Sequence, residues 1–101
     1  MLQTIAKKLN RPETYKSLQP LRENDLFIGN YCSSKWPENL GGDDMYYRAQ
    51  IINKNKLGGF EVRFIDYGNV VEVSKTELVM LQKDVQGYPA QATGQFIAII
   101  L

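Results

Sequence analysis

The sequence predicts a mainly β fold: a small, strongly bent antiparallel barrel preceded by a helix. Three observations support this prediction. Short segments alternate apolar and polar residues, turn-forming residues separate these segments, and the length suits one hydrophobic core. The chain has 101 residues, of which 44% are hydrophobic, so one compact domain is expected rather than two.

The first expected element is a short amphipathic helix over residues 2–9. Its apolar residues recur at helical spacing, while Lys7 and Lys8 occupy the opposite side. Pro12 interrupts the pattern, and residues 12–25 are expected to form a connector. Its apolar residues, which can either reach the core or extend a helix past the proline, are Tyr15, Leu18 and Leu21.

Four strands are expected after the connector. In the third of them apolar and charged residues alternate, as in a strand with one buried face. Asp66-Tyr67-Gly68-Asn69 then supplies turn residues, with Gly68 able to adopt a positive φ. A long polar loop over 37–44 separates the first and second strands, and a turn over 54–59 separates the second and third. The predicted strands cover residues 26–34, 46–52, 60–65 and 70–73.

The C-terminal third holds two further expected elements. Residues 76–81 include Leu78, Val79 and Leu81 and fit a single helical turn. Residues 96–101 are a nearly continuous apolar run, as in a strand buried on both faces. Because the last residues of a domain are usually exposed, this strand is expected to be truncated.

Composition argues against several classes of function. Twelve Lys plus Arg face eleven Asp plus Glu, a net charge of +1, so nonspecific nucleic-acid binding is not expected. The chain has no histidine and only one cysteine, which argues against disulfides, Cys/His zinc sites and His-dependent catalysis. Neither a signal peptide nor a membrane-spanning run of roughly 20 apolar residues is evident. An intracellular, reducing compartment is therefore expected.

No catalytic, metal or cofactor site is expected from the remaining polar residues. Glu38, Asp43 and Asp44 lie in a glycine-containing loop, where acidic side chains are usually solvated. Cys32 falls on the inward face of its strand and is expected to pack in the core. The chain is therefore not expected to be an enzyme.

Aromatic residues gather around the predicted turns. Trp36 follows the first strand, Tyr47 opens the second, and Phe64 and Tyr67 bracket a turn, so that both of their rings can lean over the barrel mouth. Converging rings can hold a methylated guanidinium, at about 0.5–2 kcal/mol per contact. Asn69 adds an oxygen that can accept a guanidinium N–H. The residues equally fit a second interpretation, in which the aromatics are core or hairpin residues.

Arg48 and Asp66 are expected at adjoining strand ends. There they can form a charge-assisted pair that fixes the turn. Two separately solvated charges are the alternative, and the residue pattern does not decide between them.

Three segments resemble the Tudor family, specifically its extended class. They are Tyr46-Tyr47-Arg48-Ala49, Val62-Arg63-Phe64-Ile65-Asp66-Tyr67-Gly68-Asn69 and Tyr88-Pro89-Ala90-Gln91-Ala92. The resemblance runs from about residue 20 to residue 101. It implies an N-terminal helix and connector over 1–25, a Tudor barrel core over 26–85, and the truncated start of a nuclease-like half over 86–101.

The resemblance also implies a function, a methylarginine reader. Such an adaptor binds symmetric dimethylarginine in Arg-Gly-rich tails of partners such as Piwi proteins, in the piRNA pathway and in cytoplasmic, perinuclear germ granules (nuage). Three features depart from the family pattern: Tyr46 replaces a tryptophan, the loop over 37–44 is longer and can displace Trp36, and most of the nuclease-like half is absent from the sequence. Carried over by motif, the cage residues are Trp36, Tyr47, Phe64, Tyr67 and Asn69, with Arg48 and Asp66 as structural support.

Two other functions remain open from the sequence. One is a methylation-independent interaction scaffold whose cage binds no ligand. The other is weak binding of single-stranded RNA through exposed aromatics, aided by a local basic patch. The patch consists of Lys54, Lys56 and Arg63.

Overall fold

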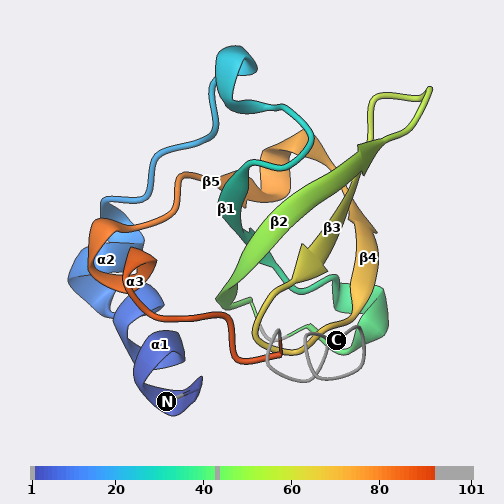
Figure 1. The fold of residues 1–101 in the computed structure, drawn as a ribbon. Helices are drawn as coiled ribbons and strands as arrows, with labels where there is room; N and C mark the ends of the chain where they lie inside the picture. Colours follow the sequence, from blue (N-terminus) through green and yellow to red (C-terminus); the bar gives the residue numbers. More distant parts are fainter. Residues whose placement is uncertain (1, 43, 93–101) are drawn as a thin grey trace.

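Five antiparallel strands form a single, strongly curled sheet in this computed structural model, which describes residues 2–42 and 44–92 (Figure 1). Their order in the sheet is β4-β3-β2-β1-β5, so among the described residues β4 and β5 are the two edges and the barrel is not closed. The mainly β, antiparallel prediction is confirmed, whereas the strand predicted over 96–101 lies outside the described residues. The strands are β1 (Tyr31–Lys35), β2 (Tyr46–Lys54), β3 (Phe60–Phe64), β4 (Val70–Val73) and β5 (Leu78–Val79).

Strands β2, β3 and β4 form where alternation predicts them. In β3 the residues at positions 60, 62 and 64 are buried and those between are half-buried. The β2–β3 register shifts between Ile51 and Asn53, which is the irregularity of a bulge. A bulge increases local bend and twist, so this shift helps to curl the sheet.

The start of the first predicted strand is wrong: β1 begins at Tyr31, not at residue 26. Residues Glu23–Asp25 form a 3-10 turn (η1), and a second turn follows, in which the Asn30 N–H donates to the Phe27 carbonyl at 3.1 Å. Gly29 has a φ of 99°, which ends any extended run there. The apolar residues Phe27 and Ile28, which suggested a strand, are half exposed on this turn.

The predicted helical turn over residues 76–81 is also wrong. A 3-10 turn (η3, Lys75–Glu77) comes first, held by a capping box between Ser74 and Glu77, and the chain then enters β5. Leu78 and Val79 are buried in strand conformation because they pair with the edge of β1. Such long-range pairing overrides the local apolar pattern.

The helices gather beside one side of the sheet (Figure 1). The predicted α1 (Leu2–Leu9) is confirmed, and α2 (Pro12–Lys16) extends helical structure past Pro12, one of the two options for this segment. Helix α3 (Lys83–Gln86) supplies Val85 to a small second core with Ile5 and Leu9. Another 3-10 turn, η2 (Glu38–Leu40), lies in the long loop between β1 and β2.

Asn10 joins the helices to the sheet. Its Nδ2 donates to the Tyr46 carbonyl at 2.9 Å, and its Oδ1 accepts the Tyr46 N–H at 2.8 Å. The side chain therefore pairs with β2 as a neighbouring strand does, which fixes where α1 ends.

The main core lies on the inner side of the curl. Every second residue of β1, β2 and β3 points into it, including Cys32, Ala49 and Val62, all fully buried. Burial raises the pKa of the Cys32 thiol from 9.0 to about 12, because desolvation disfavours the thiolate. Leu21 of the connector joins the same core.

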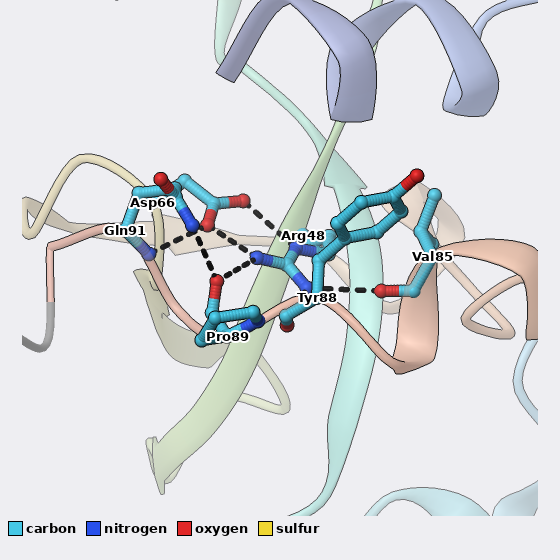
Figure 2. A network of polar contacts seen from close by, with 6 residues as sticks. All are labelled: Arg48, Asp66, Val85, Tyr88, Pro89 and Gln91. Atoms are coloured by element: carbon cyan, nitrogen blue, oxygen red, sulfur yellow. Dashed lines mark hydrogen bonds and ion pairs between the residues drawn. The ribbon is translucent and has the colours of Figure 1, made fainter. Parts of the chain in front are cut away.

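Arg48 lies on the opposite face of β2 and is buried together with Asp66 (Figure 2). The predicted pair is present: Nε donates to Asp66 Oδ2 at 2.8 Å and Nη2 donates to Oδ1 at 2.5 Å. The remaining guanidinium N–H groups donate to the carbonyls of Val85, Tyr88 and Pro89 at 3.0, 2.6 and 3.0 Å. All five donors of the guanidinium are thus used, and they hold residues 85–89 against the sheet.

None of the helices within residues 2–42 and 44–92 is long and apolar enough to cross a membrane. The same residues contain no cluster of three or more His, Cys, Asp or Glu side chains suited to a metal ion.

Asp66→Ala is expected to lower the free energy of unfolding by about 3–5 kcal/mol, because it leaves the buried Arg48 charge without its counter-charge. Urea denaturation followed by circular dichroism measures this change. Arg22→Ala is the matched control: it removes one member of a largely exposed pair with Asp25 and should change stability by less than about 1 kcal/mol. Equally small effects of both variants would contradict a stabilising role for the buried pair.

Cys32 is expected to resist alkylation by iodoacetamide at pH 8 in the folded protein. The thiolate is the reactive form, and both the raised pKa and the burial of the side chain suppress its reaction. Mass spectrometry should find the cysteine modified rapidly in denaturant and hardly at all without it. Rapid modification of the native protein would show that β1 opens readily.

Candidate functional site

Trp36, Tyr47, Phe64 and Tyr67 come together at one end of the curled sheet. Trp36 directly follows β1, and Tyr47 lies near the start of β2, on the same face as Ala49. Phe64 ends β3, and Tyr67 belongs to the turn that leads to β4. The four side chains predicted as a set are therefore neighbours in the structure.

The turn after β3 places two of the predicted site residues. The Tyr67 and Gly68 N–H groups both donate to the Phe64 carbonyl, at 3.1 and 2.7 Å. The Phe64 N–H donates to the Asn69 carbonyl at 3.0 Å, which closes the turn. Gly68 has a φ of 94°, a conformation that side chains with a Cβ rarely adopt.

Trp36 and Tyr47 each contact all three other rings, and Trp36 makes the closest contact. Its ring centroid lies 4.7 Å from that of Phe64, and the two planes are only 18° apart. Tyr47 and Tyr67 stand nearly perpendicular to it, with centroids at 5.7 and 5.9 Å. The two tyrosine rings are themselves 5.7 Å apart at 86°. These are the edge-to-face and stacked arrangements that aromatic rings prefer.

The four rings differ in exposure. Tyr67 is 46% exposed, whereas Phe64 is fully buried against Trp36 and belongs to the main core. For Phe64 the interpretation as a core residue is therefore correct in this structure. A hollow of about 330 Å³ lies between Trp36, Tyr47, Tyr67 and Gly41.

Asn69 presents an oxygen without a partner. Its Oδ1 is buried and accepts no hydrogen bond from any described residue. A buried, unsatisfied acceptor costs roughly 1–3 kcal/mol, so native structures seldom keep one without a reason. The acceptor is available for a donor supplied from outside the chain.

Trp36 also lines an acidic groove of about 530 Å³. The groove contains four carboxylates and a single lysine, Lys35, which pairs with Asp44 at 2.6 Å. The surroundings of the rings therefore favour a positively charged ligand. The sequence pattern did not reveal this groove, because its acidic residues come from separate segments: Glu38, Asp44, Glu72 and Glu77.

A second cavity, of about 540 Å³, lies on the outer face of the sheet and is separate from the rings. Arg48 lines it, and since adjacent residues of a strand point to opposite faces, Tyr47 cannot. The Arg48 donors are all used within the chain, and none of the described residues that line this cavity has a buried polar side-chain atom without a hydrogen-bond partner.

Comparisons with known proteins agree with the fold. A family model described as Tudor domain matches residues 1–98. Tudor domain-containing protein 1 of Homo sapiens is 28% identical over 87 residues, which cover 74% of this chain and 7% of that protein.

Solved structures show the same fold. The crystal structure of Tudor in complex with symmetrically dimethylated Aubergine has a TM-score of 0.71 and 27% identity, and the match covers 89% of this chain and 48% of that one. Extended-Tudor 10-11 of Drosophila melanogaster also has a TM-score of 0.71 and 27% identity, covering 89% and 23%. The chain thus spans about half of the first solved structure and a small part of the human relative.

The family model covers nearly the whole chain, and the five-stranded antiparallel sheet has the fold of these solved neighbours. The protein therefore belongs to the Tudor domain family.

Proposed function

We propose that the chain is a methylarginine reader, which binds a symmetrically dimethylated arginine in an Arg-Gly-rich tail of a partner protein. The observation that carries the proposal is the combination of converging aromatic rings with the unsatisfied oxygen of Asn69. Rings attract a delocalised cation, and the oxygen accepts one of its N–H groups. The site residues of the proposal are Trp36, Tyr47, Phe64, Tyr67 and Asn69.

Methylation changes the guanidinium in a way that suits this site. The group keeps its charge, gains apolar surface that the rings can cover, and has fewer N–H donors to satisfy. Asn69, two residues after Tyr67, offers one unsatisfied acceptor, which matches a ligand with few donors. The adjoining acidic groove increases the local attraction for an arginine-rich segment.

The solved neighbour supports this chemistry. The Tudor structure at 27% identity was determined with symmetrically dimethylated Aubergine. We extend this ligand class to the present chain and propose a Piwi-type partner, the piRNA pathway, and cytoplasmic, perinuclear germ granules as the setting. The proposed role is binding without catalysis.

Affinity for a single site is expected to be weak. A few ring contacts must offset the ordering of a flexible tail, whose immobilised side chains cost about 0.5–1.5 kcal/mol each. Several modified arginines, or several reader domains in one protein, would raise the overall affinity through effective concentration.

RNA binding is the second candidate, but the proposed basic patch is not compact. Lys54 pairs with Phe60 at one end of the β2–β3 ladder, and Arg63 pairs with Gln50 close to the other end. Gln50 and Lys54 are four steps apart along β2, a distance of about 13 Å at the usual rise per residue. The acidic groove beside the rings also opposes phosphate binding.

Tyr67→Ala is expected to reduce binding of a dimethylarginine peptide at least about tenfold, since it removes a partly exposed ring from the site. Stability should change little, because a half-exposed ring leaves no large cavity. Isothermal titration calorimetry with a symmetrically dimethylated Gly-Arg-Gly peptide measures the loss. Tyr31→Ala is the control: its ring is 50% exposed, but it lines the outer cavity. An unchanged affinity of Tyr67→Ala would remove this ring from the site.

Salt should weaken peptide binding only modestly, because ring faces hold the cation in a partly desolvated site. Binding to single-stranded RNA would instead fall steeply, with a log–log slope of about −0.7 for each neutralised phosphate. The same protein is titrated with the dimethylated peptide and with a fluorescent oligonucleotide from low to high salt. A steep oligonucleotide signal without peptide binding would favour the RNA candidate. An interaction scaffold that ignores methylation would bind neither ligand.

A further inference from the structure

We infer that Trp36 closes the ring site in the free protein and that a ligand reaches Phe64 only after this indole has moved aside. The inference rests on the proposed function, because the ring site is taken as the place where a cation binds. It makes Trp36 a competitor of the ligand and thereby a determinant of specificity.

The spacing of the rings carries the first step. A planar guanidinium between two parallel rings needs a contact of about 3.5 Å on each side, or about 7 Å between the ring planes. The Trp36 and Phe64 centroids are 4.7 Å apart, with 18° between the planes. Nothing fits between them, and the indole takes the place on the Phe64 face that a cation would occupy.

The burial of Phe64 supports the same conclusion. This ring has no exposed surface, although it stands at the end of β3 beside the exposed Tyr67. Among the residues that the structure describes, the open hollow is lined by Trp36, Tyr47 and Tyr67, with Gly41. A ligand that stays in this hollow contacts three rings, and the fourth becomes available when Trp36 leaves.

The loop after Trp36 is built to move as one piece. The indole Nε1 donates to the Leu40 carbonyl at 3.2 Å, so the ring is bonded to its own loop rather than to the sheet. The N–H groups of Leu40 and Gly42 both donate to the Pro37 carbonyl, at 3.0 and 2.9 Å. The Gly41 N–H also donates a hydrogen bond to the Glu38 carbonyl, at 3.0 Å. These bonds can persist while the loop and the indole swing together.

Closure also explains how the site would select methylated arginine. Opening exposes the apolar Phe64 face to water, so a ligand must cover that face again to offset the loss. The methyl groups of dimethylarginine supply apolar surface for this purpose. An unmethylated guanidinium, with all five N–H donors to satisfy, supplies less apolar surface and leaves more donors unmatched. Trp36 therefore disfavours the unmethylated form.

Gly42 provides a way to open the site without touching a ring. A Cβ added at this position would lie 2.1 Å from the Trp36 carbonyl oxygen and 2.8 Å from that of Pro37. Since both atoms belong to the backbone of the same loop, Gly42→Ala must change the conformation of the segment from Trp36 to Gly42 and thereby disturb the closed position of the indole. Gly87→Ala is the matched control, because a Cβ there meets nothing within 4 Å.

The test measures association and dissociation rates separately, by stopped-flow anisotropy with a fluorescein-labelled, symmetrically dimethylated Gly-Arg-Gly peptide. Gly42→Ala and Trp36→Ala should both raise the association rate constant by about threefold or more, since association is slowed by the fraction of molecules that are closed. Gly87→Ala should leave both rates unchanged. Trp36→Ala should also speed dissociation, because in the unaltered protein the indole still borders the bound ligand after it has moved aside, and the variant lacks this contact.

Two results overturn the inference. The first is faster dissociation of Trp36→Ala with an association rate constant that stays the same or falls. Trp36 would then be part of a site that is already open in the free protein, since mutations in such a site act mainly on dissociation. The other is a complete loss of binding in Trp36→Ala. Failure of the proposed function looks different, because the unaltered protein then does not bind the dimethylated peptide at all.

The single tryptophan of the chain gives an independent readout in the free protein. Trp36 emission should shift to longer wavelength, and acrylamide quenching should increase, in Gly42→Ala but not in Gly87→Ala. Should the loop of Gly42→Ala remain closed by this measure, the decision rests on Trp36→Ala alone.

Discussion

The sheet and the segment of residues 85–89 are held together by the hydrogen bonds of the buried Arg48 guanidinium, and the remainder of the fold relies on this contact. Removing an arginine and a carboxylate from water is unfavourable, and the structure offsets this only by satisfying every donor. Asp66 takes two of the five, and three backbone carbonyls take the rest. The carbonyls belong to the segment from α3 to Pro89, which has little other secondary structure. That segment is held on the sheet by a side chain rather than by strand pairing.

The same ion pair positions the ring site. Asp66 lies between Phe64 and Tyr67 in sequence, and its Oδ1 also accepts the Gln91 N–H at 3.0 Å. A carboxylate held on three sides leaves the turn little freedom, so the Tyr67 ring and the Asn69 oxygen keep their places. Because Tyr47 and Arg48 are neighbours on β2 and point to opposite faces, one strand supplies both the ring and the anchor. Stability and the geometry of the ring site are therefore coupled through a single turn.

The ring site combines an open and a closed part. Tyr47 and Tyr67 border a hollow, while Trp36 stacks on Phe64 and removes it from solvent. A protein that covers an apolar ring with its own side chain avoids an exposed apolar patch when no ligand is present. It also makes ligand binding an exchange of one ring contact for another. Such an exchange gives moderate affinity and greater selectivity, which suits the proposed reading of modified arginines.

The sequence alone determined the elements whose signal is local. Helix α1 and strands β2, β3 and β4 follow from periodicity, and the turn around Gly68 follows from its residues; the family resemblance brought the four aromatics and Asn69 together. Tertiary structure decided what depends on distant partners. Strand β5 exists because the edge of β1 pairs with it, and β1 begins at Tyr31 because the preceding turn bonds Gly29 to the Ile51 carbonyl. Whether Trp36 lines the site or covers Phe64 depends on how a loop folds over a ring 28 residues away in the sequence, and no periodicity within either segment records that contact.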